Sequence, residues 1–498
     1  MSGEREMRAA GSRRPCGQVR RQVRWGMWAR MAACAAMALG LWAQVANGAG
    51  LRLPPHEKRT LQNGLTVLLL EKHNVPIVSF YLVVNAGSAA DPVGEAGLAS
   101  MTAGLLRKGT KTRTAQQFAA DLDYIGGEFS ADAGRDFSIV SAEFLSKDLG
   151  RGLELFSAAV LHPVFPQEET DKLLRQTLDG VKAAKDEAQE VLGTYYDAYL
   201  FGAHPYGRPM GGDENSLARI KREAIVKFYE TYYAPGNAIL AVAGDFSAPD
   251  MEKRLAEVLG AWAGKAAPGV TIPTASPVKG KRLLLVDKPD STQTFFAFGN
   301  VGVTRNDPDR VAIRVVNTIF GGRLTSLLNE ELRVKSGLTY GASSGFSALK
   351  ERGAFEMYSF TRNETTVQAL DLALQVLGQL HNNGVTPEQL ASAKSYIKGQ
   401  FPPTIETSGQ LARLLAVNEF YGLDDSEVND LEARIDAVTP EVARRVIAKD
   451  FPLDNLVFAM IGKAAEIRAG VQKYAPVLDT TDIAAPGFWP PVAKEQKK

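Results

Sequence analysis

The chain has 498 residues, of which 45% are hydrophobic and 23% are charged, and its net charge at neutral pH is +1. This composition is that of an ordinary globular protein and excludes the disordered and collagen-like classes. Such a small net charge gives no bulk attraction to nucleic acid, so no nucleic-acid partner is expected.

The first 48 residues predict a secretory signal peptide. An arginine-rich start is followed by an apolar run from Met31 to Val45 and then by Ala46-Asn47-Gly48, an order typical of such peptides. The apolar run has 15 residues, whereas a membrane-spanning helix needs about 20, so a retained anchor is the weaker alternative. We expect export across the inner membrane, into a periplasm, without a stable membrane anchor.

Both cysteines, Cys16 and Cys34, lie in this leader. The rest of the chain then has no thiol, which excludes disulfides, a cysteine nucleophile and thiolate metal ligands. The leader holds eight arginines and two glutamates, so without it the 57 basic and 56 acidic residues fall to 49 and 54, a net charge of −5. A cysteine-free chain suits an oxidising compartment.

Residues 52–262 predict a first α+β domain. Val, Leu and aromatic residues favour the strands, and periodic apolar positions favour the helices. The expected order is strands at 65–71 and 77–85, helices at 94–106 and 114–125, an alternating hairpin-like stretch at 129–144, and a helix at 149–161.

A Gly- and Pro-rich stretch at 263–280 predicts a linker, and residues 281–478 repeat the pattern of the first half. Two similar α+β units in tandem are therefore expected, followed by a Pro-containing, charged tail at 479–498. The second unit is expected to have strands at 282–287 and 294–300, helices at 308–320 and 324–332, paired strands at 340–346 and 353–361, and a helix at 365–380.

Four separated segments give the chain a resemblance to a known family. They are "NGLTVLLLEKHNVPIVSFYLVVNAGSAADPVGEAGLASMTAGLLRKGT" at 63–110, "HPYGRP" at 204–209, "YYAPGNAILAVAGDF" at 232–246 and "GGRLTSLLNEELRVKSGLTYGASSGF" at 321–346. In this order they resemble the M16 peptidases, the insulinase, pitrilysin and mitochondrial-processing-peptidase family, over residues 56–478. The resemblance implies two tandem LuxS/metallohydrolase-like α+β domains, each an antiparallel-rich sheet with helices packed on one face.

Active M16 members carry His-x-x-Glu-His in a helix, where two His bind zinc and the Glu acts as a base. The matching positions of this chain are Ser100, Ala103 and Gly104. None of these residues can bind zinc or take up a proton at neutral pH. The chain is therefore expected to hold no metal and to catalyse no proteolysis by itself.

The resemblance implies a third ligand, a Glu, further along the chain. The window 178–187 offers Asp179, Asp186 and Glu187 without a clear match, and Ala183 stands where the acid would be. A lone carboxylate would not hold catalytic zinc, which takes about three protein ligands. No two of the five histidines are spaced for one helix face, so we expect them to be solvated or hydrogen-bonded: His56, His73, His162, His204 and His381.

The second half contains "EELRVKSGLTYG" at 330–341. In the family, an Arg and a Tyr seven residues later bind the substrate peptide, and Arg333 and Tyr340 match that pair. A guanidinium and a phenol are donors that can hold a peptide carbonyl and stabilise an oxyanion, and Gly337 suits a helix C-cap between them. The structural alternatives are an Arg333 paired with Glu330 or Glu331 at a helix end and a Tyr340 half-buried in a strand.

The resemblance also implies that the alternating stretch at 127–144 holds an edge strand, which in active relatives pairs with substrate backbone.

Three hypotheses follow. The first is a non-zinc subunit of a heterodimeric M16-type zinc metalloendopeptidase, in which a partner with an intact motif binds zinc and this chain supplies Arg333 and Tyr340 for peptides or unfolded chains. The second is a non-enzymatic M16-like scaffold or peptide-binding protein. The third is a homodimer that only captures peptides.

Overall fold

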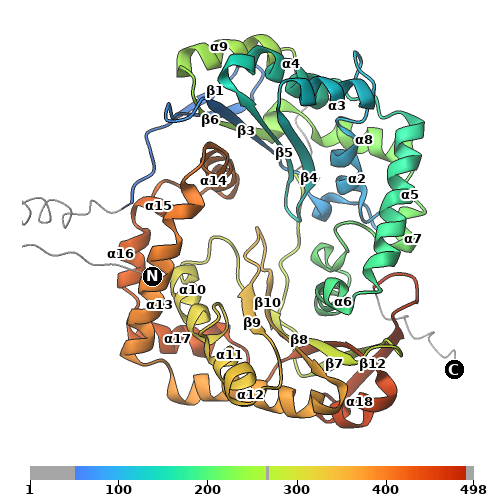
Figure 1. Cartoon of the computed structure of the whole chain (residues 1–498), viewed down its shortest axis with the longest axis vertical. Helices are drawn as coiled ribbons and strands as arrows, with labels where there is room; N and C mark the ends of the chain where they lie inside the picture. Colours follow the sequence, from blue (N-terminus) through green and yellow to red (C-terminus); the bar gives the residue numbers. More distant parts are fainter. Residues whose placement is uncertain (1–50, 265–268, 489–498) are drawn as a thin grey trace, which may run out of the picture. The chain divides into compact units, whose positions relative to one another are not determined.

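The computed structural model describes residues 51–264 and 269–488 (Figure 1). Every helix and strand given below belongs to one compact unit that begins at Leu53. The expected signal peptide at 1–48 lies outside the described residues.

The first half is built on a six-stranded mixed sheet with the order β1-β2-β6-β3-β5-β4. β2 and β6 run parallel, and the other neighbours are antiparallel. The strands are β1 Glu57–Thr60, β2 Thr66–Glu71, β3 Ile77–Val84, β4 Glu128–Ala133, β5 Ser138–Leu145 and β6 Ala238–Gly244. The helices are α2 Leu98–Leu105, α3 Ala115–Tyr124, α4 Leu149–Leu161, α5 Gln167–Ala184, α6 Ala188–Phe201, α7 Glu214–Leu217, α8 Arg222–Tyr232 and α9 Ala248–Leu259.

The second half has a six-stranded sheet with the order β12-β7-β11-β8-β10-β9, in which β7 runs parallel to both of its neighbours. Its strands are β7 Arg282–Asp287, β8 Gln293–Val301, β9 Ala342–Phe346, β10 Ala354–Arg362, β11 Val457–Gly462 and β12 Val477–Asp482. Its helices are α10 Arg310–Phe320, α11 Leu327–Asn329, the π-helix η5 Glu330–Lys335, α12 Thr366–Asn383, α13 Pro387–Gln400, α14 Ser408–Tyr421, α15 Ser426–Asn429, α16 Leu431–Asp436, α17 Pro440–Asp450 and α18 Ala464–Val471.

The two sheets follow one plan. The run β2-β6-β3-β5-β4 of the first half has the same order and the same strand directions as β7-β11-β8-β10-β9 of the second. This correspondence confirms the tandem α+β architecture. The strands and helices expected at 65–161 and 282–380 are present with shifts of a few residues at their ends, apart from the helix expected at 324–332.

Each half packs its own helices on one face of its sheet. Side chains alternate between the two faces of a strand. In the first sheet, Phe80 and Leu82 of β3 belong to a core that also contains residues of α2, α3, α4, α8 and α9. In the second, Phe296 and Phe298 of β8 belong to a core shared with α10, α12, α13, α17 and α18.

The opposite face of each sheet is covered by a helix from the other half. α14 of the second half contacts β2, β3 and β6, where Leu70, Tyr81 and Val83 are buried outside the first core. α6 of the first half contacts β8 and β11, and its Tyr196 hydroxyl donates to the Phe355 carbonyl oxygen at 2.8 Å. The two halves thus exchange one helix each, as the placement of α6 and α14 in Figure 1 shows.

The boundary expected for the tail, at residue 479, is wrong. Residues 477–482 form β12, which pairs in parallel with β7, and the following Ile483 and Phe488 are buried. β12 lies at the edge of the sheet, where polar side chains are tolerated. Its sequence, "VLDTTD", is therefore too polar for a strand to be predicted from it. Residues 489–498 lie outside the described part of the chain.

The helix expected at 324–332 begins later and has a different winding. Leu324 is exposed, Ser326 caps the helix by accepting from the Asn329 amide, and the segment continues as a π-helix to Lys335. The linker expected at 263–280 has neither helix nor strand among its described residues. In the part of the chain that the structure covers, no helix is long and apolar enough to cross a membrane.

Candidate functional site

The three positions that match the zinc motif lie on α2, and their surroundings are packed. The Ser100 hydroxyl donates to the Met210 carbonyl oxygen at 2.9 Å, and Ala103 has no exposed surface. A Cβ atom added to Gly104 would lie 3.2 Å from Cδ2 of Leu173 on α5. These residues do not fit zinc, because they offer one hydroxyl that is already engaged and two positions without a donor atom.

The window at 178–187, where the resemblance implies a third zinc ligand, lies at the end of α5 and in the turn that follows. Asp179, Ala183, Asp186 and Glu187 are all exposed there. The α5 residues that reach α2 come earlier: Leu173 lies against Gly104, and the Thr177 hydroxyl lies 3.7 Å from the Met101 sulfur. The window therefore supplies no carboxylate directed at the motif positions.

Three of the histidines, His73, His204 and His381, form side-chain hydrogen bonds at separate places in the fold. His73 lies in the turn after β2, 2.8 Å from Asp245 and 3.4 Å from Glu71, and these hydrogen bonds raise its pKa. His204 and His381 contact the backbone oxygens of Pro273 and Phe451. Within residues 51–264 and 269–488, no three His, Cys, Asp or Glu side chains are grouped so that they could hold a metal.

Arg333 lies on the π-helix η5 and is exposed. Arg333 does not pair with Glu330 or Glu331, as the structural alternative would require. Lys335 pairs with them instead, and its ammonium lies 2.7 Å from Glu331 and 4.0 Å from Glu330. Among the described residues, no hydrogen bond or ion pair to the Arg333 guanidinium is found. π-helical turns are rare and occur frequently at functional sites, so this guanidinium is held on an unusual turn and is free to bind.

Tyr340 precedes β9 and its side chain is 82% exposed, so it is not the half-buried strand aromatic of the structural alternative. The backbone that carries it is fixed. Gly337 has a φ of +62° and ends the helix in the left-handed conformation. The amide of Leu338 then donates to the Leu332 carbonyl at 3.0 Å. The hydroxyl of the buried Thr339 donates to the Gly341 carbonyl and accepts from the Gly341 amide.

A side-chain clamp ties this turn to the helix before it. Asn329, which is buried at the end of α11, donates to the Ala342 carbonyl at 2.7 Å and accepts from the Ala342 amide at 3.1 Å. Arg333 and Tyr340 are therefore carried by one braced helix-turn-strand unit. They lie on different elements from Ser100, Ala103 and Gly104, and no described hydrogen bond joins the two sets.

Two family models match the sequence of this chain, one after the other. Residues 66–214 match the model described as Insulinase (Peptidase family M16), and residues 219–397 match Peptidase M16 inactive domain. The chain belongs to peptidase family M16. The first match spans α2, which carries Ser100, Ala103 and Gly104.

Relatives and solved structures agree with this membership. An uncharacterized zinc protease of Mycobacterium leprae is 28% identical over 77% of this M16 chain and 86% of its own. Another from Bacillus subtilis is 23% identical over 80% and 97%. The crystal structure of a peptidase M16 inactive domain from Pseudomonas fluorescens matches with a TM-score of 0.77 and 28% identity over 82% of this chain and 98% of that one. A Helicobacter pylori protease, at 22% identity, has the same fold with a TM-score of 0.76.

Sequence reasoning missed one ionisable group in the second sheet of this M16 chain. Glu356 of β10 lines a cavity of about 460 Å³ beside β9, together with Gln189, Ser344 and Tyr358. Burial, with the negative charge of Asp197 adding to it, raises the pKa of Glu356 to about 7. The signal in the sequence was a charged residue between the apolar Phe355 and Met357. This alternation places Glu356 on the strand face of Tyr358, opposite the face on which Phe355 and Met357 enter the core of the second half.

Replacing Glu356 with Gln is expected to change the pH dependence of stability. The folded state holds this proton to about pH 7, above the usual value of 4.5, so stability falls as the pH rises through that window. The wild type should lose about 2 kcal/mol relative to Glu356→Gln between about pH 5 and about pH 8. Urea unfolding of both proteins at the two pH values measures this difference, and parallel pH profiles would contradict it.

Proposed function

We propose that this chain is the non-zinc subunit of a two-chain M16-type zinc metalloendopeptidase that cleaves peptides or unfolded chains. In this proposal a second M16 subunit carries the intact His-x-x-Glu-His motif and the zinc, and this chain supplies Arg333 and Tyr340 to the bound substrate. The complex would act after export of the chain, in the periplasm.

The observation that carries the proposal is the free state of Arg333 and Tyr340. Both are exposed, although five other residues of the same short segment are engaged in fixing its backbone or in ion pairs: Asn329, Glu331, Lys335, Gly337 and Thr339. A scaffold has no physical reason to brace a turn in this way and leave its guanidinium and its phenol unpaired.

These two side chains suit one task. The Arg guanidinium and the Tyr hydroxyl are donors, and together they can hold a substrate carbonyl and stabilise the negative charge that develops on its oxygen. Zinc chemistry would belong entirely to the partner subunit. What this chain contributes is position and charge at the side of the peptide away from the metal.

A peptide-binding protein without catalysis is the second candidate, favoured by the edge strand β4. β4 ends the first sheet, so one side of its backbone has no strand neighbour in the described structure. Beside it lies a cavity of about 530 Å³ lined by Glu128, Ser130 and Tyr81 together with Arg413 of α14. An extended peptide can add to such an edge through backbone hydrogen bonds, with no need of zinc.

Co-expression separates the two candidates. The chain is purified alone and together with an M16 relative that carries an intact zinc motif, and zinc content and cleavage of an unfolded peptide are measured in both samples. The proposal expects a stable complex, zinc only in the partner, and cleavage only in the mixture. A partner that cleaves equally well without this chain would overturn the proposal.

If the chain binds the same peptide alone, without a complex and without cleavage, the peptide-binding candidate replaces the subunit proposal. The control is the partner chain with its motif Glu replaced by Gln. It should assemble normally and show no cleavage, which proves that the activity comes from the zinc site of the partner.

A further inference from the structure

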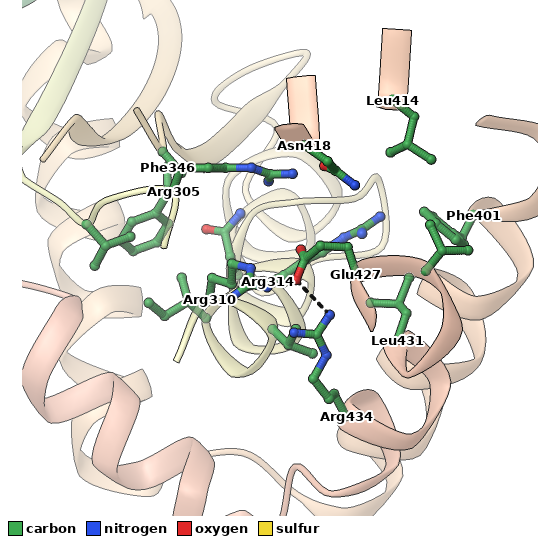
Figure 2. A pocket seen from close by; sticks show the side chains of 16 residues that line it. Arg305, Arg310, Arg314, Phe346, Phe401, Leu414, Asn418, Glu427, Leu431 and Arg434 are labelled. Carbon is green, nitrogen blue, oxygen red and sulfur yellow. Dashed lines mark hydrogen bonds and ion pairs between the residues drawn. The ribbon is translucent and has the colours of Figure 1, made fainter. Parts of the chain in front are cut away.

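A cavity of about 300 Å³ lies in the second half, between α10 and the helices α14, α15 and α16. Four arginines line it, with a single acidic residue, Glu427, among them (Figure 2). They are Arg305 in the loop after β8, Arg310 and Arg314 on α10, and Arg434 on α16. One carboxylate cannot neutralise four guanidiniums, so the cavity has an excess of positive charge.

The acid is already shared by two of the arginines. Glu427 pairs with Arg310 and accepts from Arg434 at 3.1 Å. The side chains of Arg305 and Arg314 form no hydrogen bond or ion pair with any residue in the described parts of the chain. Burial lowers the pKa of Arg310, and the nearby positive charges of Arg434 and Arg305 lower it further, as expected for cations held close together.

Two buried polar groups of the same cavity also have no partner. Asn418 of α14 is 5% exposed, and its side-chain oxygen makes no hydrogen bond in the described structure. The Nε atom of Arg434 is buried and unpaired as well. A buried polar group without a partner is unfavourable and calls for an explanation, and a bound ligand that supplies the missing partner is one.

Apart from two asparagines, Asn317 and Asn418, the remaining wall is apolar. Figure 2 shows Phe401, Leu414 and Leu431 together on one side of the cavity, across from Arg305 and Arg310. Arg314 is exposed, so the positive end can be reached from solvent. A ligand that fits must therefore combine an anionic group for the guanidiniums, an apolar body, and an N–H donor for Asn418.

We propose that this cavity binds the carboxyl-terminal residue of a peptide. The carboxylate would lie on the guanidiniums of Arg305 and Arg314, because the planar fork of Arg matches a carboxylate. The apolar side chain would lie against Phe401, Leu414 and Leu431, and the N–H of the residue would donate to Asn418. The site needs neither zinc nor a second subunit, so it stands independently of the peptidase proposal.

Binding to the purified chain alone tests this site by calorimetry. The probes are acetyl-Ala-Ala-Leu with a free carboxylate, the same peptide as its carboxyl-terminal amide, octanoate, and inorganic phosphate. The acid is expected to bind at least tenfold more tightly than the amide, octanoate or phosphate. Arg305→Gln and Arg314→Gln should each weaken binding of the acid about tenfold or more, since each removes a charge-assisted hydrogen bond.

The matched control is Arg362→Gln, which removes an equally charged side chain that is 70% exposed at the end of β10 and outside the cavity. Its affinity should equal that of the wild type, and thermal unfolding should show all variants folded. Equal binding of acid and amide would overturn the proposal. So would equal binding of octanoate or phosphate, unchanged affinity in both cavity variants, or no binding of the acid at millimolar concentration.

Discussion

Replacing Arg333 with Ala is expected to lower kcat/KM of the assembled two-chain peptidase by about 10²–10³-fold, the usual cost of losing one donor to a developing oxyanion. Because Arg333 is exposed and no described residue pairs with it, the fold loses nothing that holds it together. Assembly and zinc content should therefore stay at the wild-type level. Steady-state peptide cleavage, size-exclusion chromatography and metal analysis measure the three quantities.

The matched control for this experiment is Arg362→Ala, which removes an exposed Arg of the same half whose ion pair, at 3.3 Å, is with the exposed Glu364. Its kcat/KM should stay within about twofold of the wild type, since surface ion pairs contribute little. Tyr340→Phe, which removes only the hydroxyl, should lower activity in the same direction as Arg333→Ala. Wild-type turnover in Arg333→Ala would remove the case for an enzyme subunit and leave the peptide-binding candidate.

Replacing Lys185 with Ala is expected to destabilise the fold by about 3–5 kcal/mol, as when one member of a buried ion pair is removed. Lys185 is 6% exposed, and its ammonium donates to Glu214 at 2.6 Å and to the Ala485 carbonyl at 2.7 Å. Burial raises the pKa of Glu214, but the hydrogen bonds from Lys185 and from the Gly487 amide outweigh it, so the pKa lies below its usual range. Without Lys185, that partly buried carboxylate loses its cationic partner and keeps the hydrogen bond from the Gly487 amide.

Urea unfolding measures this loss, and limited proteolysis tests its location. The contacts of Lys185 hold residues 485–487 against the first half, so cleavage after β12 should become faster in Lys185→Ala. Lys182→Ala is the control, because it removes an exposed Lys from the same helix and should change stability by less than about 0.5 kcal/mol. Equal stability of the two variants would show that the pair does not hold the segment.

The regular elements could be predicted where local signals were strong. Apolar runs gave β2, β3, β7 and β8, and amphipathic spacing gave α3, α4, α10 and α12 within a few residues. The two helices that the halves exchange, α6 and α14, were not assigned, although the buried residues of each recur at helical spacing, Val191, Leu192, Tyr195 and Tyr196 in α6 and Leu411, Ala412, Leu415 and Ala416 in α14. Their burial depends on contacts with residues far away in sequence, which local periodicity does not contain.

The sequence was enough to predict which residues form the candidate site, but not what surrounds them in the fold. The spacing of Arg333 and Tyr340 singled out the pair, whereas their exposure, the π-helical turn and the Asn329 clamp come only from the fold. The four arginines around the 300 Å³ cavity lie between residues 305 and 434 and share no motif. Only the packing of α10 against α16 and its neighbours brings them to one place.

The exchange of α6 and α14 also bears on how the chain is made. The strands of the first sheet are complete once Gly244 has been synthesised, but α14, which covers the face with Leu70, Tyr81 and Val83, begins only at Ser408. During that interval an apolar face stays open to water and to other nascent chains, the usual origin of aggregation during folding. The first half should therefore need a chaperone until the second half emerges.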